Sequence, residues 1–169
     1  MALCLDDRLA VAQRALGRSV VVVNPDARRE AARKRDGYLC FGVKDDAGIP
    51  GELVEKFRIS PDWLPLTVDH KSDLGRSVDT ELVNPLTYRP MTGSTSGGPI
   101  NVLKGINDVC VGTDGGGSVL APALATSLFA FMGKGLGLTV TGDSRSTDCI
   151  AFRGGIGFVG NDLERVVSA

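Results

Sequence analysis

The stretch VGTDGGGSVLAPA, from Val111 to Ala123, decides the interpretation of this 169-residue chain. Three consecutive glycines and a serine separate an apolar, strand-like run from a longer apolar, helix-like run. The pattern predicts a strand, a tight turn and a helix that begins at Ser118. So much backbone freedom in front of a single hydroxyl raises the question of what that hydroxyl does.

The glycine–serine loop has three interpretations. The first N–H groups of a helix have no partner within it, and glycines let such groups face open space. They can then hold the oxyanion that forms when a hydroxyl attacks a carbonyl, or they can hold a phosphate. A glycine turn can also be a packing device and nothing more. The loop does not match GxxxxGK[ST], which argues against a nucleotide P-loop.

The rest of the chain alternates apolar runs with turns. Helices are expected over residues 5–16, 27–36 and 118–132, in a short turn around 52–57, and within the stretch 91–105, which begins as a loop and leads into a short helix. Residue Asn161 is expected to cap a final helix. Strands are expected over 19–23, 38–43, 63–69 and 109–111, with short strands and turns over 136–160. Residues 70–93 are expected to be irregular because they contain Pro85 and Pro90.

Composition narrows the class of protein. The length fits one domain, 1–169, and 43% apolar with 23% charged residues is typical of a globular chain. A net charge of −1 favours neither nucleic acid nor an anionic membrane as a partner, and no apolar run is long enough to span a bilayer. The N-terminus lacks a signal-peptide pattern. The four cysteines show no metal-binding or redox spacing, which predicts reduced thiols and a cytoplasmic location; they are Cys4, Cys40, Cys110 and Cys149.

A nucleophilic serine needs a base, and two side chains are considered. The single histidine, His70, lies in a polar loop and is interpreted as a surface residue. Lys44 directly follows the apolar run YLCFGV, where burial would lower its pKa enough for it to act as a base. The neighbouring acids Asp45 and Asp46 lack the spacing of a divalent-cation loop and are interpreted as solvated loop residues.

Five segments resemble the amidase signature family, in the order in which that family has them. From about residue 38 to the end of the chain they read FGVKDDAGIPG (41–51), HKSDLGRS (70–77), NPLTYRPMTGSTSGGP (84–99), VGTDGGGSVLAPA (111–123) and GFVGNDLERVVSA (157–169). The likeness covers the N-terminal, signature half of the family in a shortened and divergent form. It implies an α/β fold in which a mixed β-sheet is flanked by helices.

The resemblance also implies a function: hydrolysis of amide C–N bonds by a Ser–cis-Ser–Lys triad, without metal or organic cofactor. By motif position Ser118 is the nucleophile, Lys44 the base and Thr95, with Ser96 next to it, the bridging hydroxyl. Asp114 is the acid of the family's GTD motif. The expected oxyanion-binding amides belong to Gly115, Gly116 and Gly117.

Partners follow from the same resemblance. A small-molecule amide is the expected substrate. Because the likeness stops before the family's second half, a second copy or a partner subunit is expected to cover the exposed sheet. The alternative is an inactive, amidase-like scaffold that binds a ligand or a partner chain.

Overall fold

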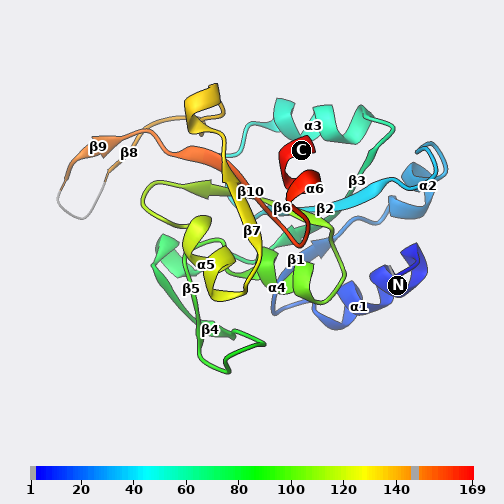
Figure 1. Ribbon diagram of the computed structural model, residues 1–169, viewed down its shortest axis with the longest axis horizontal. Coiled ribbons are helices and arrows are strands. Elements are labelled where there is room, and N and C mark those ends of the chain that lie inside the picture. Colours follow the sequence, from blue (N-terminus) through cyan, green and yellow to red (C-terminus); the bar gives the residue numbers. More distant parts are fainter. Residues whose placement is uncertain (1–2, 146–148) are drawn as a thin grey trace.

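A six-stranded mixed sheet forms the centre of the molecule in the computed structural model, which describes residues 3–145 and 149–169 (Figure 1). In spatial order its strands are β1 (Val20–Val23), β3 (Trp63–Asp69), β2 (Leu39–Lys44), β6 (Val109–Asp114), β10 (Gly155–Gly160) and β7 (Phe129–Met132). The three strands β3, β2 and β6 run parallel, and the outer pairings are antiparallel. The predicted α/β fold with a mixed sheet is therefore confirmed.

Alternation along the strands directs neighbouring side chains to opposite faces of the sheet. On one face, Phe41 of β2 packs with Phe57 of α3 (Gly51–Ile59) and Val166 of α6 (Leu163–Ser168) in one apolar cluster. Phe57 and Trp63 also meet edge to face, with ring centroids 5.4 Å apart. These contacts dock α3 and α6 on that face.

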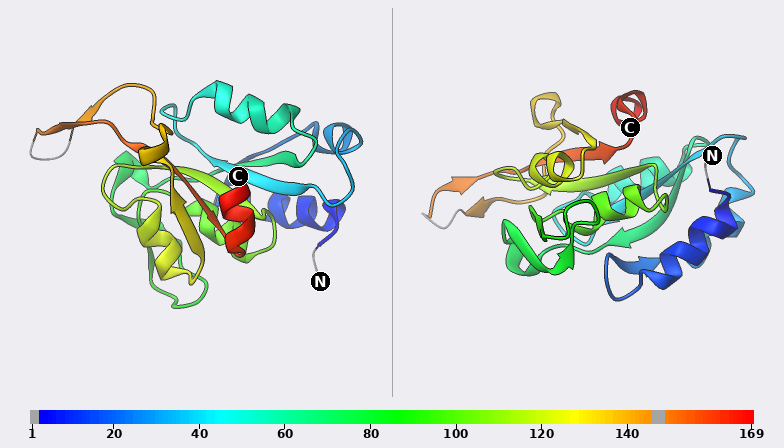
Figure 2. Two further views of the ribbon diagram at one scale, coloured as in Figure 1. Left: turned by 45° about the horizontal axis from the view of Figure 1, so that its top comes forward. Right: turned by 60° about the horizontal axis from the view of Figure 1, so that its bottom comes forward.

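The opposite face is covered by helices from three parts of the chain. Cys40 of β2 packs with Ala12 of α1 (Leu5–Arg14), and α2 (Ala27–Ala31) contributes to the same cluster. Cys110 of β6 packs with Val102 of α4 (Gly97–Leu103) and Ala123 of α5 (Leu120–Ala125). Figure 2 shows α1 and α6 on opposite sides of the sheet.

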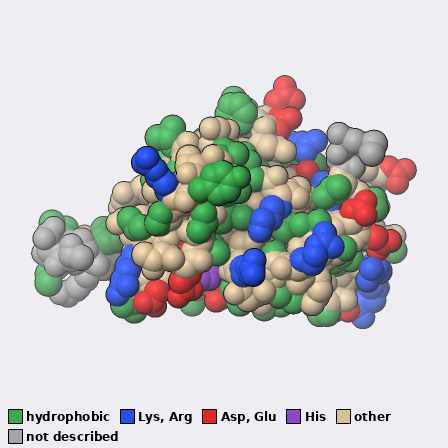
Figure 3. Space-filling view, turned by 90° about the horizontal axis from the view of Figure 1, so that it is seen from below, with side chains coloured by type: hydrophobic (Ala, Val, Ile, Leu, Met, Phe, Trp, Pro, Cys, Tyr) green, Lys and Arg blue, Asp and Glu red, His purple; other side chains and the backbone are tan. Residues whose placement is uncertain are grey.

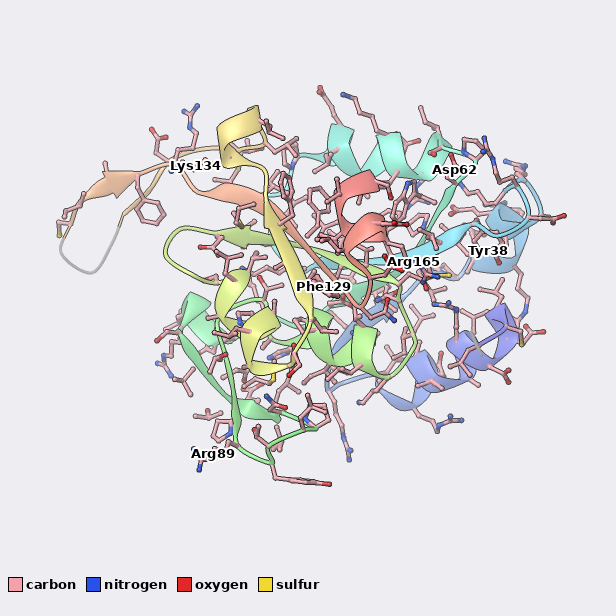
Figure 4. All side chains as sticks on the ribbon, in the orientation of Figure 1. Tyr38, Asp62, Arg89, Phe129, Lys134 and Arg165 are labelled. Atoms are coloured by element: carbon pink, nitrogen blue, oxygen red, sulfur yellow. The ribbon has the colours of Figure 1, made fainter. Side chains whose placement is uncertain are left out.

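Asp108, just before β6, ties these layers together. Its buried carboxylate accepts hydrogen bonds from Arg8 of α1 at 3.1 Å, from Arg165 of α6 at 2.8 Å and from the Cys40 N–H at 2.8 Å. Arg165 is labelled in Figure 4. Both guanidinium groups balance its charge, so its burial is compensated.

Smaller elements extend from this body. A hairpin of β4 (Val78–Val83) and β5 (Pro90–Thr92) follows the 3-10 turn η1 (Asp73–Gly75), and a second turn, η2 (Lys134–Leu136), follows β7. The strands β8 (Ser144–Arg145) and β9 (Ala151–Phe152) pair and project from the sheet, at the left of Figure 1. No helix among residues 3–145 and 149–169 is long and apolar enough to cross a membrane.

Three expected elements are corrected. The helix predicted over 118–132 is two elements, α5 and β7, because the Thr126 hydroxyl donates to the carbonyls of Pro122 and Ala123 and Ser127 has a positive φ of 55°. The segment predicted to be irregular, 70–93, contains the β4–β5 hairpin, with Pro90 at a strand end where its missing N–H costs little. The cap of α6 is Asp162 and not Asn161.

Candidate active site

Lys44 ends β2, and its side chain is buried with only 2% exposure. Its Nζ lies 2.7 Å from Ser94 Oγ and 2.7 Å from the Oγ1 of Thr113, which belongs to the adjacent strand β6. The sheet places Lys44 beside Thr113, because β2 and β6 are neighbouring parallel strands. The ammonium group therefore exchanges water for hydroxyl partners.

Asp46 is not the solvated loop residue that was predicted. Its Oδ2 lies 3.4 Å from Lys44 Nζ and accepts a hydrogen bond of 2.8 Å from the Thr113 hydroxyl. The Gly48 N–H donates to the other carboxylate oxygen at 2.9 Å. Lys44, Thr113 and Asp46 thus form one hydrogen-bonded cluster.

The pKa values in this cluster follow from burial and charge. Burial lowers the pKa of Lys44 below its usual value, although the Asp46 carboxylate acts in the opposite direction. Burial acts to raise the pKa of Asp46, but the Gly48 N–H, the Thr113 hydroxyl and Lys44 outweigh it and hold the pKa low. The neutral amine of Lys44 is therefore reached at a lower pH than in a solvated lysine.

Ser118 follows the glycine loop and opens into α5. The loop is shaped by Asp114, whose carboxylate accepts the N–H groups of Gly117 at 2.5 Å and Val119 at 2.7 Å. Burial acts to raise the pKa of Asp114, but these backbone donors lower it further than burial raises it. Gly117 has φ of +115°, which favours glycine.

The predicted oxyanion-binding amides divide into two groups. The N–H of Gly117 donates to Asp114. Within the described part of the chain, the N–H groups of Gly115 and Gly116 have no hydrogen-bond acceptor. A methyl group on Gly115 would lie 2.1 Å from the Phe152 ring, so a larger side chain there would displace Phe152. The loop thus leaves two adjacent donors for a ligand.

The three consecutive hydroxyls Ser94, Thr95 and Ser96 point in different directions. Ser94 Oγ contacts Lys44. Thr95 Oγ1 is buried without a hydrogen-bond partner among the described residues, and Ser96 Oγ donates to Asp79 at 2.5 Å. The expected contact of Thr95 or Ser96 with Lys44 is therefore absent from this structure, and Ser94 makes it instead. No peptide bond between described residues is cis.

Backbone hydrogen bonds hold the Ser94 loop against both neighbours. The Thr95 N–H donates to the Ser118 carbonyl at 3.1 Å, which joins this loop to the glycine loop. The Ser72 N–H donates to the Ser94 carbonyl at 3.2 Å. These bonds bring the segments that carry Ser94 and Ser118 together.

His70 is not a free surface residue, since its Nε2 lies 3.0 Å from Asp79 Oδ2 and 3.8 Å from Glu81 Oε2. Figure 3 shows the histidine in purple beside acidic side chains. Asp79 is the same buried carboxylate that accepts from Ser96. His70 therefore belongs to a cluster that holds the β4 hairpin to the Ser96 end of the loop.

An open cleft of about 1020 Å³ adjoins these residues. Lys44, Ser94 and Ser118 line it together with Gly115 and Gly116, and Leu74, Val140 and Phe152 add apolar surface. A hydroxyl nucleophile, a lysine with a lowered pKa and free backbone donors can together perform acyl transfer.

The sequence interpretation missed three of these residues. Ser94 immediately precedes the motif pair that was assigned the bridging role, and a run of three hydroxyls was the available signal. Thr113 stands next to Asp114 in the quoted motif, and Asp46 lies two positions after Lys44. Neither position alone indicated that Thr113 and Asp46 would meet at Lys44.

Comparison with known proteins gives a result at the level of structure. No protein-family model matches the sequence, and no curated protein matches it significantly. Among solved structures, 6-aminohexanoate cyclic dimer hydrolase is similar with a TM-score of 0.73 and 16% identity over 97% of this chain. The native peptide amidase from Stenotrophomonas maltophilia has a TM-score of 0.67 and 20% identity over 96% of it.

The likeness covers only part of these enzymes. The chain spans 41% of the length of each, and 32% of the allophanate hydrolase of Kluyveromyces lactis, which matches with a TM-score of 0.54 and 13% identity over 94% of this chain. Identities this low establish the fold alone. The chain therefore has the mixed α/β fold of a part of these amide hydrolases.

Proposed function

We propose that this protein hydrolyses amide C–N bonds, with Ser118 as the nucleophile. The observation that carries the proposal is the buried Lys44 Nζ, 2.7 Å from Ser94 Oγ, in the wall of the cleft that Ser118 also lines. A solvent-exposed lysine would stay protonated near neutral pH, whereas burial favours its neutral, basic form. The similar amide hydrolases add support from fold.

In the proposed reaction, the Ser118 Oγ attacks the carbonyl carbon of the amide. Its proton passes to Ser94 Oγ while the Ser94 proton passes to the neutral amine of Lys44. The carbonyl oxygen becomes negative and accepts hydrogen bonds from the Gly115 and Gly116 amides. Ser94 thus takes the bridging role that the motif position assigned to Thr95.

Collapse of the tetrahedral intermediate breaks the C–N bond. The proton held by Lys44 returns through Ser94 to the leaving nitrogen, so that an amine departs and an acyl ester remains on Ser118. Water then attacks the ester, giving up a proton along the same route. Hydrolysis releases the carboxylic acid and restores the Ser118 hydroxyl.

The test is intact-mass labelling with a fluorophosphonate, which reacts with activated serines, at neutral to mildly alkaline pH. One adduct on the parent protein, mapped to the peptide containing Ser118 and lost in Ser118→Ala and Lys44→Met, is the expected result. Turnover of small primary amides is then measured with the same three proteins. A folded parent that takes no label would contradict the proposal and favour a ligand-binding scaffold.

A further inference from the structure

The hydrogen bonds around Lys44 have a direction that the geometry determines. Lys44 Nζ has Ser94 Oγ and Thr113 Oγ1 each at 2.7 Å and Asp46 Oδ2 at 3.4 Å. Thr113 Oγ1 in turn lies 2.8 Å from Asp46 Oδ2. Asp46 is held in place by the Gly48 N–H, so its carboxylate is a fixed end of this chain of bonds.

An ionised carboxylate accepts hydrogen bonds and cannot donate them. The single proton of the Thr113 hydroxyl must therefore point to Asp46, and the Thr113 oxygen can only accept from Lys44. A neutral amine has two N–H bonds and one lone pair. With its N–H bonds directed at the hydroxyl and the backbone carbonyl of Thr113, which lie 2.7 Å and 3.5 Å from Nζ, the lone pair of Lys44 is left facing Ser94.

We propose that Asp46, acting through Thr113, orients the lone pair of Lys44 toward Ser94 and holds Lys44 by its charge. The consequence for catalysis rests on the proposed function, but the hold of Asp46 on Lys44 does not. Asp46 and Thr113 are positioning residues here, because neither needs to touch the substrate.

The other charges near Lys44 are weaker than that of Asp46. Burial lowers the pKa of Lys44 most, and Asp46 opposes it with the largest charge effect. Lys71 lowers the Lys44 pKa further, and Asp114, with the smallest of these effects, raises it. Asp45 is exposed, and in the structure it makes no ion pair with a described residue. It therefore offers a matched control, since its replacement removes the same charge one position away.

The deciding experiment titrates Lys44 by NMR of its side-chain carbon, assigned with Lys44→Arg, in the parent, Asp46→Asn and Asp45→Asn. Removing the carboxylate beside an ammonium lowers the pKa of that ammonium. The Lys44 midpoint is expected to fall by about one pH unit or more in Asp46→Asn and to stay at the parent value in Asp45→Asn. Equal midpoints in the two variants would overturn the proposal.

Orientation is tested separately from charge with Thr113→Val and Thr113→Ser. The rate of fluorophosphonate labelling, measured at a pH above the Lys44 midpoint of each protein, is expected to fall about tenfold in Thr113→Val and to be restored by Thr113→Ser. Thermal unfolding verifies that both variants fold. Unchanged labelling in Thr113→Val would overturn the orienting role. A parent that takes no label refutes the proposed function alone, and the titration then decides the inference by itself.

Discussion

At the scale of single residues, Ser94 and Thr95 are neighbours with opposite surroundings. The Thr95 hydroxyl is fully buried and has no hydrogen-bond partner among the described residues, whereas Ser94 faces Lys44. Replacing a buried, unpaired hydroxyl by a methyl group removes a desolvation cost. Thr95→Val is therefore expected to unfold at the parent Tm or above it.

Thr126→Val is the matched control, because the buried Thr126 hydroxyl donates to two carbonyl groups at the end of α5. Its loss is expected to lower the free energy of unfolding by about 1 kcal/mol. Thermal and urea unfolding of the two variants measure the difference. A Thr95→Val protein as destabilised as Thr126→Val would show that the Thr95 hydroxyl has a partner.

Asp69, at the end of β3, gives a prediction on pH. Its fully buried carboxyl accepts from Thr67 and Asn101, but burial outweighs these bonds and raises its pKa from 3.8 to about 7. Between these values the folded state binds a proton that the unfolded state does not. The contribution of Asp69 to the free energy of unfolding is thus complete below about pH 4 and is lost as the pH rises to about 7.

Asp69→Asn keeps an acceptor oxygen for Thr67 and Asn101 and cannot titrate. Urea unfolding at pH 5 and pH 8 is expected to show a smaller loss of stability in the variant than in the parent, by an amount on the order of a few kcal/mol. The same change with pH in both proteins would contradict the raised pKa.

At the scale of elements, β6 depends on a glycine. A methyl group built on Gly112 would lie 2.6 Å from both Thr95 Oγ1 and Thr95 Cγ2, inside the packed core next to the site. Gly112→Ala is expected to lower the free energy of unfolding by about 1–3 kcal/mol. Gly51→Ala, at the start of α3 with nothing within 4 Å of the added methyl group, is the control and is expected to be neutral. Equal stability of both variants, measured in urea, would contradict this account of β6.

The sequence predicted some helices and strands well and others wrongly, for a physical reason in each case. The strands over 20–23, 39–44 and 63–69 were predicted nearly in full because each is an apolar run whose ends coincide with turn residues. The run after Ser118 was misassigned because its apolar residues suit a helix or a strand equally. Residues Phe129–Met132 form a strand because they pair with β10, which lies more than twenty residues later in the sequence.

In the candidate site, too, the sequence indicated some residues, whereas their contacts depend on tertiary packing. Lys44 and Ser118, which the sequence indicated as candidates, stand at element ends, and the structure brings both to the cleft. Which of Ser94, Thr95 and Ser96 faces Lys44 depends on how the loop is hydrogen-bonded to Ser118 and Ser72. Sequence spacing carries no information on that packing.

At the scale of the whole molecule, the sheet ends in two edge strands, β1 and β7. Phe129 of β7 is 48% exposed, and Leu124 of the neighbouring α5 is 82% exposed (Figure 4 labels Phe129). Open edges flanked by apolar side chains favour strand pairing. We expect a second copy to pair with β7, and sedimentation velocity is expected to show a dimer that Phe129→Lys weakens and the edge variant Val22→Lys does not. A monomer at all concentrations would contradict this expectation.

In the proposed reaction, Ser94 carries the proton between Ser118 and Lys44. The test is the fluorophosphonate labelling rate of the parent, Ser94→Ala and Thr95→Val at one pH above the Lys44 midpoint. The rate is expected to fall about 100-fold or more in Ser94→Ala and to stay close to the parent rate in Thr95→Val. Rapid labelling of Ser94→Ala together with loss in Thr95→Val would contradict this role of Ser94 and return the bridging role to Thr95.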